Sequence, residues 1–461
     1  MRTIRTATYG AQMSTSLSRR TFLARTGLAT AGAGALGLTA CTGSDGPTAV
    51  RTGTGTATGV PAFDPADWAS VRAQFGLDPD LAHFAAFVLA SHPAPVRDAI
   101  ATYRDELDRD TVAATGQEVE REDAARGAAA EYLEVAGEEI ALTDSTTMGL
   151  GLIYHGLRLD AGDHILTSTH DFYATHEALR LAATKRGAAV QRIPLYDDPA
   201  AASVDQIVGR VRAGIRPNTR VVALTWVHSS TGVKLPVREI ANAIADANRN
   251  RAAPDRAVFC LDAVHGLGAD ATSPAALGCD VFMSGTHKWL FGPRGTGIVW
   301  AHRRAWDHLA PIIPTFSGPS FGAWFDGTTA PFQFGLDGTP GGFHSFEHRW
   351  ALTEAFRFHL DIGKQRVADR TTELAARLKD GLAELPNVAL VTPRDPKLSA
   401  GVVCCEVNGQ DPREVVNGLR SAHRIVASAT PYQTSYVRLG PSIVTTPEQV
   451  DQAIQALGAM T

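Results

Sequence analysis

A single lysine, Lys288, lies between a histidine and a tryptophan in the stretch SGTHKWLFGPRGTG, residues 284–297. The flanking stretches CDVFM and GIVWA are apolar and predict buried strands, so the lysine stands at the end of a core strand. A strongly hydrated ammonium is costly in such a place unless it is paired or chemically engaged. Asp262 and His265 follow another apolar run, FCL, and supply a carboxylate and an imidazole at a second strand end.

Two further stretches add an anion site and an aromatic ring. Thr146 and Thr147 lie in TDSTTMG, where a strand gives way to a helix whose first N–H groups suit a phosphate. Phe172 and Tyr173, in THDFYATH, are rival candidates for a ring-stacking partner. An amine, a carboxylate, a flat ring and an anion site are what pyridoxal 5′-phosphate (PLP) requires, because its aldehyde forms a Schiff base with lysine and its ring nitrogen needs a carboxylate. The residues therefore favour a PLP site.

Strand and helix patterns alternate from Trp68 to about residue 340, which predicts an α/β fold with a mostly parallel sheet covered on both faces. Polar residues gather after the strands, where such sheets bind ligands. Residues 348–385 are helix-periodic over their whole length, and short strands and helices follow. We expect five segments: a signal at 1–41, a flexible tether at 42–63, an N-terminal segment at 64–115 packing with the small domain, a large PLP-binding domain at 116–340, and a small α+β domain at 341–461.

In combination these motifs resemble the fold-type I, class V aminotransferase-like enzymes. Within that family the sequence is similar to the isopenicillin N epimerase-like branch. The Thr-Thr turn, the Asp with His three residues later, the His-Lys pair and the following GPRGTG occur in the family's order. The stretch YVRLGPSIVTTPEQVD resembles the family's C-terminal part, and the resemblance covers about residues 64–455. It implies a three-layer PLP-transferase fold with a smaller C-terminal α+β domain.

The resemblance also implies a role for each candidate residue. Lys288 would form the Schiff base and act as general base and acid, Asp262 would hold the ring nitrogen protonated, and His265 would contact the ring's phenolic oxygen. The other implied contacts are phosphate binding by Thr146, Thr147 and His287, ring stacking by Phe172, and substrate binding by Arg438 and Ser229. Gly285 replaces the serine common in relatives, so Ser284 or Thr286 is expected to supply that phosphate contact. The alternatives are helix capping, core packing and surface ion pairing.

The sequence leaves the reaction open. Cysteine desulfurases need a cysteine on a C-terminal loop, and the matching stretch RIVASATPYQTSY has Ser428 and Tyr432 but no cysteine. The four cysteines beyond Cys41 are expected as buried thiols, with no metal-ligand spacing. An aminotransferase or epimerase acting on an amino-acid or peptide-derived amine is our main hypothesis. A lyase or oxidative decarboxylase that modifies a secreted peptide such as a siderophore is the alternative, and a non-catalytic lipid-anchored binding protein is a remote one.

The N-terminal stretch SRRTFLARTGLATAGAGALGLTAC resembles a twin-arginine export signal that ends in a lipobox. Adjacent Arg19 and Arg20 precede a short apolar run, and Cys41 would be the lipidated residue. We therefore expect the twin-arginine machinery as a partner, an extracytoplasmic location and contact with the membrane through a lipid anchor. The net charge of −5 argues against a nucleic-acid partner. The resemblance implies a homodimer, with His344 and His348 near the partner subunit.

Overall fold

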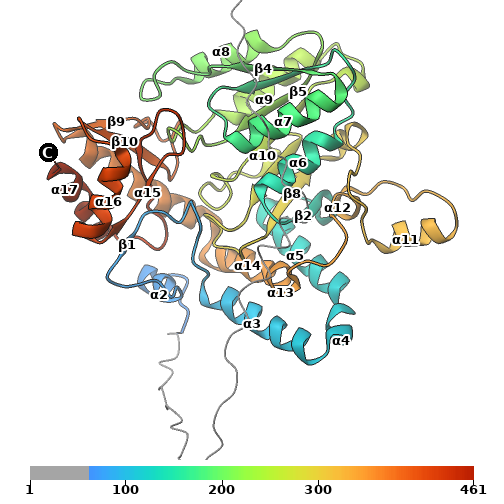
Figure 1. Ribbon diagram of the computed structural model, residues 1–461, viewed down its shortest axis with the longest axis horizontal. Coiled ribbons are helices and arrows are strands. Elements are labelled where there is room, and N and C mark those ends of the chain that lie inside the picture. The colour runs from blue at the N-terminus through green and yellow to red at the C-terminus, as the bar shows by residue number, and fades with distance from the viewer. Residues whose placement is uncertain (1–61, 461) are drawn as a thin grey trace, which may run out of the picture. The chain divides into compact units, whose positions relative to one another are not determined.

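A central sheet dominates the computed structural model, which describes residues 62–460. The predicted signal with Cys41 lies outside the described residues, as does most of the predicted tether. Within them the sheet runs in the order β2-β8-β7-β6-β5-β3-β4 and is parallel except at β8, which is antiparallel to both its neighbours. The α/β prediction with a mostly parallel sheet is confirmed (Figure 1). In spatial order the strands are β2 (Ile140–Thr143), β8 (Gly297–Ala301), β7 (Val281–Gly285), β6 (Val258–Asp262), β5 (Thr219–Thr225), β3 (His164–Ser168) and β4 (Ala189–Ile193).

Helices cover both faces of this sheet, because its central strands are apolar on both sides. Along β6, Phe259 and Leu261 pack into one core cluster, whereas Val258 and Cys260 pack into the other. Each strand therefore joins two cores, which gives three layers. The helices that contribute to the first cluster include α5 (Glu118–Leu133), α8 (Val204–Gly214), α9 (Val237–Asn248) and α14 (Leu352–Ile362), and those of the second include α6 (Thr146–Gly156) and α7 (Tyr173–Arg186).

A smaller antiparallel sheet near the C-terminus has the order β12-β13-β10-β9. Its helices bury Leu378, Leu419 and Val450 against β10, as the expected small α+β domain requires. Cys404 and Cys405 face different core clusters, in agreement with their adjacent positions in a strand. The elements are α15 (Lys364–Ala383), β9 (Val388–Leu390), β10 (Val403–Val407), α16 (Pro412–His423), β11 (Ile425–Val426), β12 (Ser428–Ala429), β13 (Val437–Leu439) and α17 (Pro447–Gly458).

The N-terminal segment contacts both parts of the chain. β1 pairs in parallel with β11 of the small domain, and α3 packs against α13 and α14. Among residues 62–460, no helix combines the length and apolar character that crossing a membrane requires. The remaining elements are α2 (Trp68–Ala73), β1 (Ala82–His83), α3 (Ala94–Arg109), α4 (Thr111–Thr115), η1 (Gly137–Glu139), η2 (Ala253–Asp255), α10 (Pro274–Leu277), η3 (Arg303–His308), α11 (Gly318–Phe325), α12 (Phe334–Asp337) and α13 (Phe346–Trp350).

The helix-periodic stretch 348–385 is not one helix. It ends its first long run at Ile362 and begins again at Lys364, because Gly363 adopts φ +91°, a conformation that favours glycine. The chain turns there from helix α14, on the large sheet, to α15, on the small one. The helical periodicity of the sequence predicts which residues are buried, but it does not show that α14 and α15 pack into two different cores.

The structure buries one histidine, His359, without any polar partner among the described residues. Its side chain is fully buried, both ring nitrogens lack hydrogen bonds, and the rings of Tyr132, Phe291 and Phe358 surround it. Burial lowers its pKa to about 3. In the unfolded chain His359 binds a proton below about pH 6.5, whereas in the folded chain it binds one only below about pH 3. The free energy of unfolding therefore falls as the pH falls through this window.

We predict that His359→Leu stabilises the protein by about 1–3 kcal/mol at pH 8, because it removes two unsatisfied nitrogens. The gain should be about 2 kcal/mol larger at pH 5, since the leucine variant has no proton to lose on folding. Urea unfolding at the two pH values measures both effects. His423→Leu, on α16, is the control for the same exchange on another helix; an equal gain in both variants would contradict the assignment.

Candidate active site

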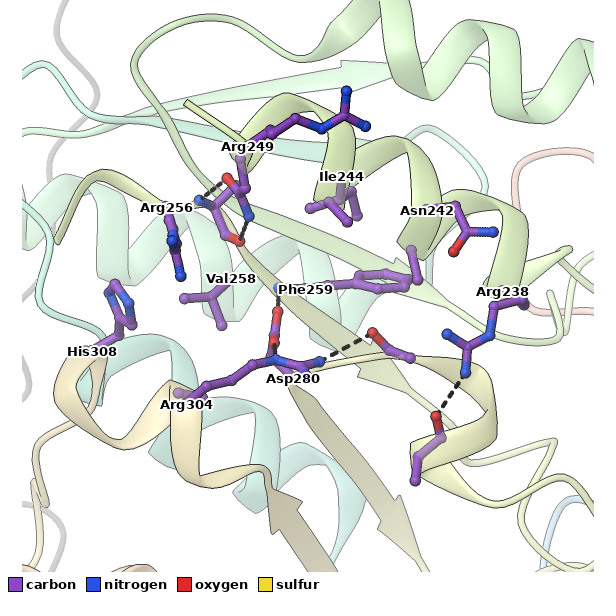
Figure 2. A pocket seen from close by; sticks show the side chains of 17 residues that line it. Arg238, Asn242, Ile244, Arg249, Arg256, Val258, Phe259, Asp280, Arg304 and His308 are labelled. Atoms are coloured by element: carbon purple, nitrogen blue, oxygen red, sulfur yellow. Dashed lines mark hydrogen bonds and ion pairs between the residues drawn. The ribbon is translucent and has the colours of Figure 1, made fainter. Parts of the chain in front are cut away.

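Among the cavities formed by residues 62–460, two lie at opposite edges of the central sheet. The one at the amino ends of β6 and β7, of about 410 Å³, is lined by several arginines (Figure 2). Its polar groups are largely bound by the chain itself: Arg304 pairs with Asp280, Arg238 donates to the carbonyls of Ala275 and Ala276, and Asn248 bonds the backbone of Ala257. These bonds tie loops to strands, so we assign this cavity a structural role.

The other cavity, of about 300 Å³, lies at the carboxyl ends of the strands and collects the titratable residues. The parallel strands end at one edge, so side chains far apart in the sequence meet there. Of the residues predicted from the sequence, the cavity wall includes Thr146, Thr147, Phe172, Ser229, Asp262, His265, His287, Lys288 and Arg438. This is the candidate active site.

Lys288 is the central group of this cavity. Its Nζ lies 3.4 Å from Nε2 of His265. Burial lowers the pKa of Lys288 to about 8; the carboxylate of Asp262 opposes this shift and the guanidinium of Arg438 adds to it. A lysine with a lowered pKa carries a larger neutral fraction near neutral pH, and the neutral amine is the nucleophile that an aldehyde requires.

Asp262, the last residue of β6, is buried at the base of the cavity. One carboxylate oxygen accepts a hydrogen bond from the N–H of Val264 at 3.1 Å, and the other lies 3.4 Å from the hydroxyl of Thr175. Burial raises its pKa to about 6, and the Val264 N–H and the charge of Lys288 limit the rise. A carboxylate held in this way can keep a cationic ring nitrogen protonated.

The start of α6 forms an anion-binding end of the cavity. Ser145 caps the helix by accepting from the N–H of Met148, and Thr146 and Thr147 follow as its first residues. The Oγ1 of Thr146 accepts a hydrogen bond from the Gly285 N–H at 2.7 Å, which ties the helix start to β7. Nδ1 of His287 is buried without a partner among residues 62–460 and belongs to the cavity wall. An unpaired imidazole nitrogen beside a helix N-terminus suits a phosphate when that nitrogen carries a proton.

Neither Ser284 nor Thr286 belongs to the cavity wall, although one of them was expected to contact the phosphate. Ser284 Oγ donates to the carbonyl of Gly285, and Thr286 Oγ1 bonds the hydroxyl and carbonyl of Thr296. Both hydroxyls therefore form hydrogen bonds at the end of β7 and in the turn that follows it. Position 285, where serine is common in relatives, has little room for a side chain. A Cβ at Gly285 would lie 2.7 Å from Cε1 of His287 and 3.0 Å from Oγ1 of Thr146.

The opposite end of the cavity is aromatic and cationic. Arg438 donates to the Ser229 carbonyl at 3.0 Å and to Ser428 Oγ at 3.1 Å. Tyr432 bonds Ser229 Oγ at 2.7 Å, and its ring meets that of Phe172 edge-on. Phe172 is 38% exposed and lines the cavity, whereas its rival Tyr173 is 70% exposed and lies outside the wall.

Sequence reasoning missed several residues that build the site. Phe87 and Val88 line the cavity from the N-terminal segment, and the Arg438 guanidinium lies 4.5 Å from the centre of the Phe87 ring. Their stretch HFAAFVLA has no clear strand or helix period, so only its apolar character could have drawn attention to it. Asp171 was also missed: it accepts from the N–H of Thr225 and so fixes the loop that carries Phe172.

His344 lies beside Glu122 of its own chain, and its expected place near a partner subunit stays a prediction. Its Nε2 lies 3.8 Å from a carboxylate oxygen of Glu122, close enough with Glu118 for the three side chains to form a possible cation cluster. Arg126 and Arg349 already pair with Glu122 at 2.8 and 3.0 Å. Two guanidinium groups neutralise this carboxylate, which disfavours a metal ion there.

The residues of the cavity fit PLP: a partly buried lysine, a carboxylate at the base, and a helix start with an unpaired imidazole nitrogen for the phosphate. The fold and this site define a PLP-dependent enzyme of fold type I. The aminotransferase class-V family model matches residues 90–451, so the chain belongs to this family.

Individual relatives differ in their reactions. The chain is 26% identical over 419 residues to isopenicillin N epimerase of Streptomyces clavuligerus, covering 86% of this chain and 99% of that one. It is also 26% identical to a probable cysteine desulfurase of Xylella fastidiosa, covering 73% and 79%. A solved C-DES mutant, with glycine covalently linked to the PLP cofactor, has the same fold at a TM-score of 0.75 and 21% identity, covering 85% and 99%.

We predict that Gly285→Ser weakens PLP binding about tenfold or more, because the new Cβ displaces His287 and Thr146 at the phosphate end. Titration of the apoprotein with PLP, followed by tryptophan fluorescence, measures the change. Gly151→Ala is the matched control, since it lies on the same helix α6 with open space around the added Cβ. Unchanged affinity in Gly285→Ser would show that neither side chain contacts the phosphate.

Proposed function

We propose that this protein is a PLP-dependent enzyme that moves a proton at the α-carbon of an amino-acid or peptide-derived amine, of the aminotransferase or epimerase type. The observation that carries the proposal is Lys288, whose partly buried Nζ lies in one cavity together with Asp262 and His265. When bound, PLP supplies an electron-withdrawing ring that acidifies the α-hydrogen of an attached amine.

The protein's own residues then have distinct tasks. Lys288 removes and returns the proton through Nζ, helped by a pKa lowered to about 8. Asp262 holds the proton of the ring nitrogen. Arg438 is anchored through Nε and Nη1, while its Nη2 makes no hydrogen bond within residues 62–460 and is available for a substrate carboxylate. Phe172 would stack on the cofactor ring, and Ser229 with Tyr432 would border the substrate space.

A cysteine desulfurase is disfavoured, although such enzymes are among the relatives. That reaction needs a reactive thiol at the substrate, and the loop that would carry it presents Tyr432. Cys404 and Cys405 are fully buried in β10, and burial raises the pKa of Cys404 to about 12. A buried thiol of high pKa is a poor nucleophile.

A lyase that modifies a sulfur-containing or peptidic metabolite is the second candidate. It is supported by similarity to a probable hercynylcysteine sulfoxide lyase of Mycobacterium tuberculosis, 26% identical over 248 residues. An oxidative decarboxylase acting on a secreted peptide such as a siderophore belongs to the same group of hypotheses. A non-catalytic binding protein would have no need of both Lys288 and Asp262.

We predict that the holoenzyme, incubated with amino acids in deuterated water, incorporates deuterium at Cα, and that Lys288→Ala lowers this rate about 100- to 10,000-fold. Mass spectrometry of the recovered amino acid measures exchange, and chiral chromatography separates epimerisation from simple exchange. The exposed Lys185→Ala is the control and should retain the wild-type rate. Equal exchange in Lys288→Ala and wild type would refute the proposal.

The same experiment separates the reaction types. Conversion of PLP to the pyridoxamine form indicates transamination, and release of pyruvate or ammonia indicates a lyase. Deuterium at Cα with neither outcome, and with inverted configuration, indicates an epimerase.

We further propose that the protein is exported by the twin-arginine route, lipid-anchored at Cys41 and dimeric. The support is the adjacent Arg19 and Arg20 ahead of a short apolar run that ends at Cys41. We predict that replacing both arginines by lysine retains the protein in the cytoplasm, whereas Cys41→Ala permits export but releases the protein from the membrane. Cell fractionation with immunoblotting measures both; normal export of the double-lysine variant would contradict the route.

A further inference from the structure

Trp289, the residue after Lys288, makes a direct hydrogen bond to the histidine that faces the lysine. Its indole Nε1–H donates to Nδ1 of His265 over 3.2 Å, and both side chains are buried. Burial also lowers the pKa of His265 well below its usual value, so the ring is neutral. A neutral imidazole whose Nδ1 accepts a hydrogen bond carries its proton on Nε2. The bond from Trp289 therefore selects one tautomer.

The selected tautomer determines what Lys288 meets. Nε2 of His265 lies 3.4 Å from Nζ of Lys288. An Nε2–H group can donate to the lone pair of a neutral amine, whereas it offers nothing to an ammonium, which has only donors. The opposite tautomer would present a lone pair and stabilise the ammonium. The other charged groups that act on Lys288 come from separate elements: Asp262 from β6 and Arg438 from β13.

Close contacts from the small domain hold the indole in place. A Cβ added at Gly401 would lie 2.5 Å from Cη2 of Trp289, and one at Gly440 would lie 3.1 Å from the same atom. These glycines precede β10 and follow β13, so the small sheet approaches the ring as closely as glycine allows. The ring of Phe87 lies 6.1 Å away on the N-terminal segment. Because these contacts hold the indole, its N–H remains directed at His265.

We propose that Trp289 is a positioning residue that fixes the tautomer of His265 and thereby increases the neutral, reactive fraction of Lys288. The small domain, through Gly401 and Gly440, would then support the chemistry at Lys288 without touching substrate. The catalytic consequence rests on the proposed function, whereas the tautomer and the protonation state of Lys288 are properties of the apoprotein and can be measured without it.

The first test needs no variant of Trp289. Histidine labelled with ¹⁵N in the apoprotein is observed by NMR, and the His265 signals are identified by their absence in His265→Gln. We expect a neutral ring with its proton on Nε2 and a bare Nδ1. A proton on Nδ1, or a rapidly exchanging mixture, would overturn the proposal.

The second test measures the pKa of Lys288 directly. The folded apoprotein is acylated at a series of pH values, and the extent of acylation at Lys288 is quantified by mass spectrometry of the peptide that contains it. Trp289→Phe keeps the ring but removes the donor, and we expect the pKa of Lys288 to rise by about one unit, with acylation at pH 7 about tenfold slower. Trp300→Phe is the matched control: its buried indole donates to Glu139 at 2.9 Å, away from the cavity, and its loss should leave the Lys288 pKa unchanged. Equal pKa values in wild type and Trp289→Phe would overturn the proposal.

A third comparison separates tautomer control from packing. In a His265→Gln background no tautomer exists to be selected, so adding Trp289→Phe should change the Lys288 pKa no further. An equal rise in both backgrounds would assign the effect to packing and overturn the proposal. Gly401→Ala displaces the indole while every hydrogen-bonding group stays, and it should raise the pKa in the same direction. Failure of the protein to bind PLP would refute the proposed function but leave these apoprotein measurements intact.

Discussion

The cavity depends on a partly buried amine, Lys288, that must stay close to a carboxylate without forming a permanent ion pair with it. Burial alone lowers the pKa of Lys288 and raises that of Asp262, so each group is pushed toward its neutral form. Their mutual attraction opposes both shifts. A direct, fully formed ion pair would make Lys288 a poor nucleophile, and complete isolation would leave Asp262 unable to hold a charge. In the structure the two groups belong to different elements: Asp262 ends strand β6, and Lys288 lies in the turn after β7.

This constraint explains why so much of the fold converges on a small volume. The parallel sheet brings Asp262 and Lys288 to one edge, while helix α6 begins at the same edge with free N–H groups. The N-terminal segment adds Phe87, and the small domain adds Arg438. Each of these elements belongs to a different part of the sequence. The active site is therefore the place where the parts of the compact unit meet, and stability and chemistry share the same contacts.

Similarity to the family and departure from it have separate physical sources. The cofactor-facing groups are set by the chemistry of PLP, which is common to epimerases, lyases and desulfurases. The substrate-facing wall is set by residues such as Tyr432 and Ser229, which bond one another where a desulfurase would need a thiol. Gly285 stands between the two regions. Its missing side chain leaves room for the side chains of His287 and Thr146, which a Cβ at this position would contact closely.

The sequence by itself determined the class of fold, the cofactor and most of the residues that line the candidate cavity, because strand and helix periods are local and Lys288, Asp262 and the Thr146–Thr147 turn have chemistry that few other sites need. It also indicated the absence of a loop cysteine. The break at Gly363 escaped it, because a change of packing partner leaves the helical period intact. Only the tertiary structure decided that Thr286 turns away to Thr296, that Phe87 completes the cavity, and that the Trp289 indole reaches His265. The physical reason is that hydrogen-bond direction and close packing depend on segments brought together across the whole chain, and no local pattern records them.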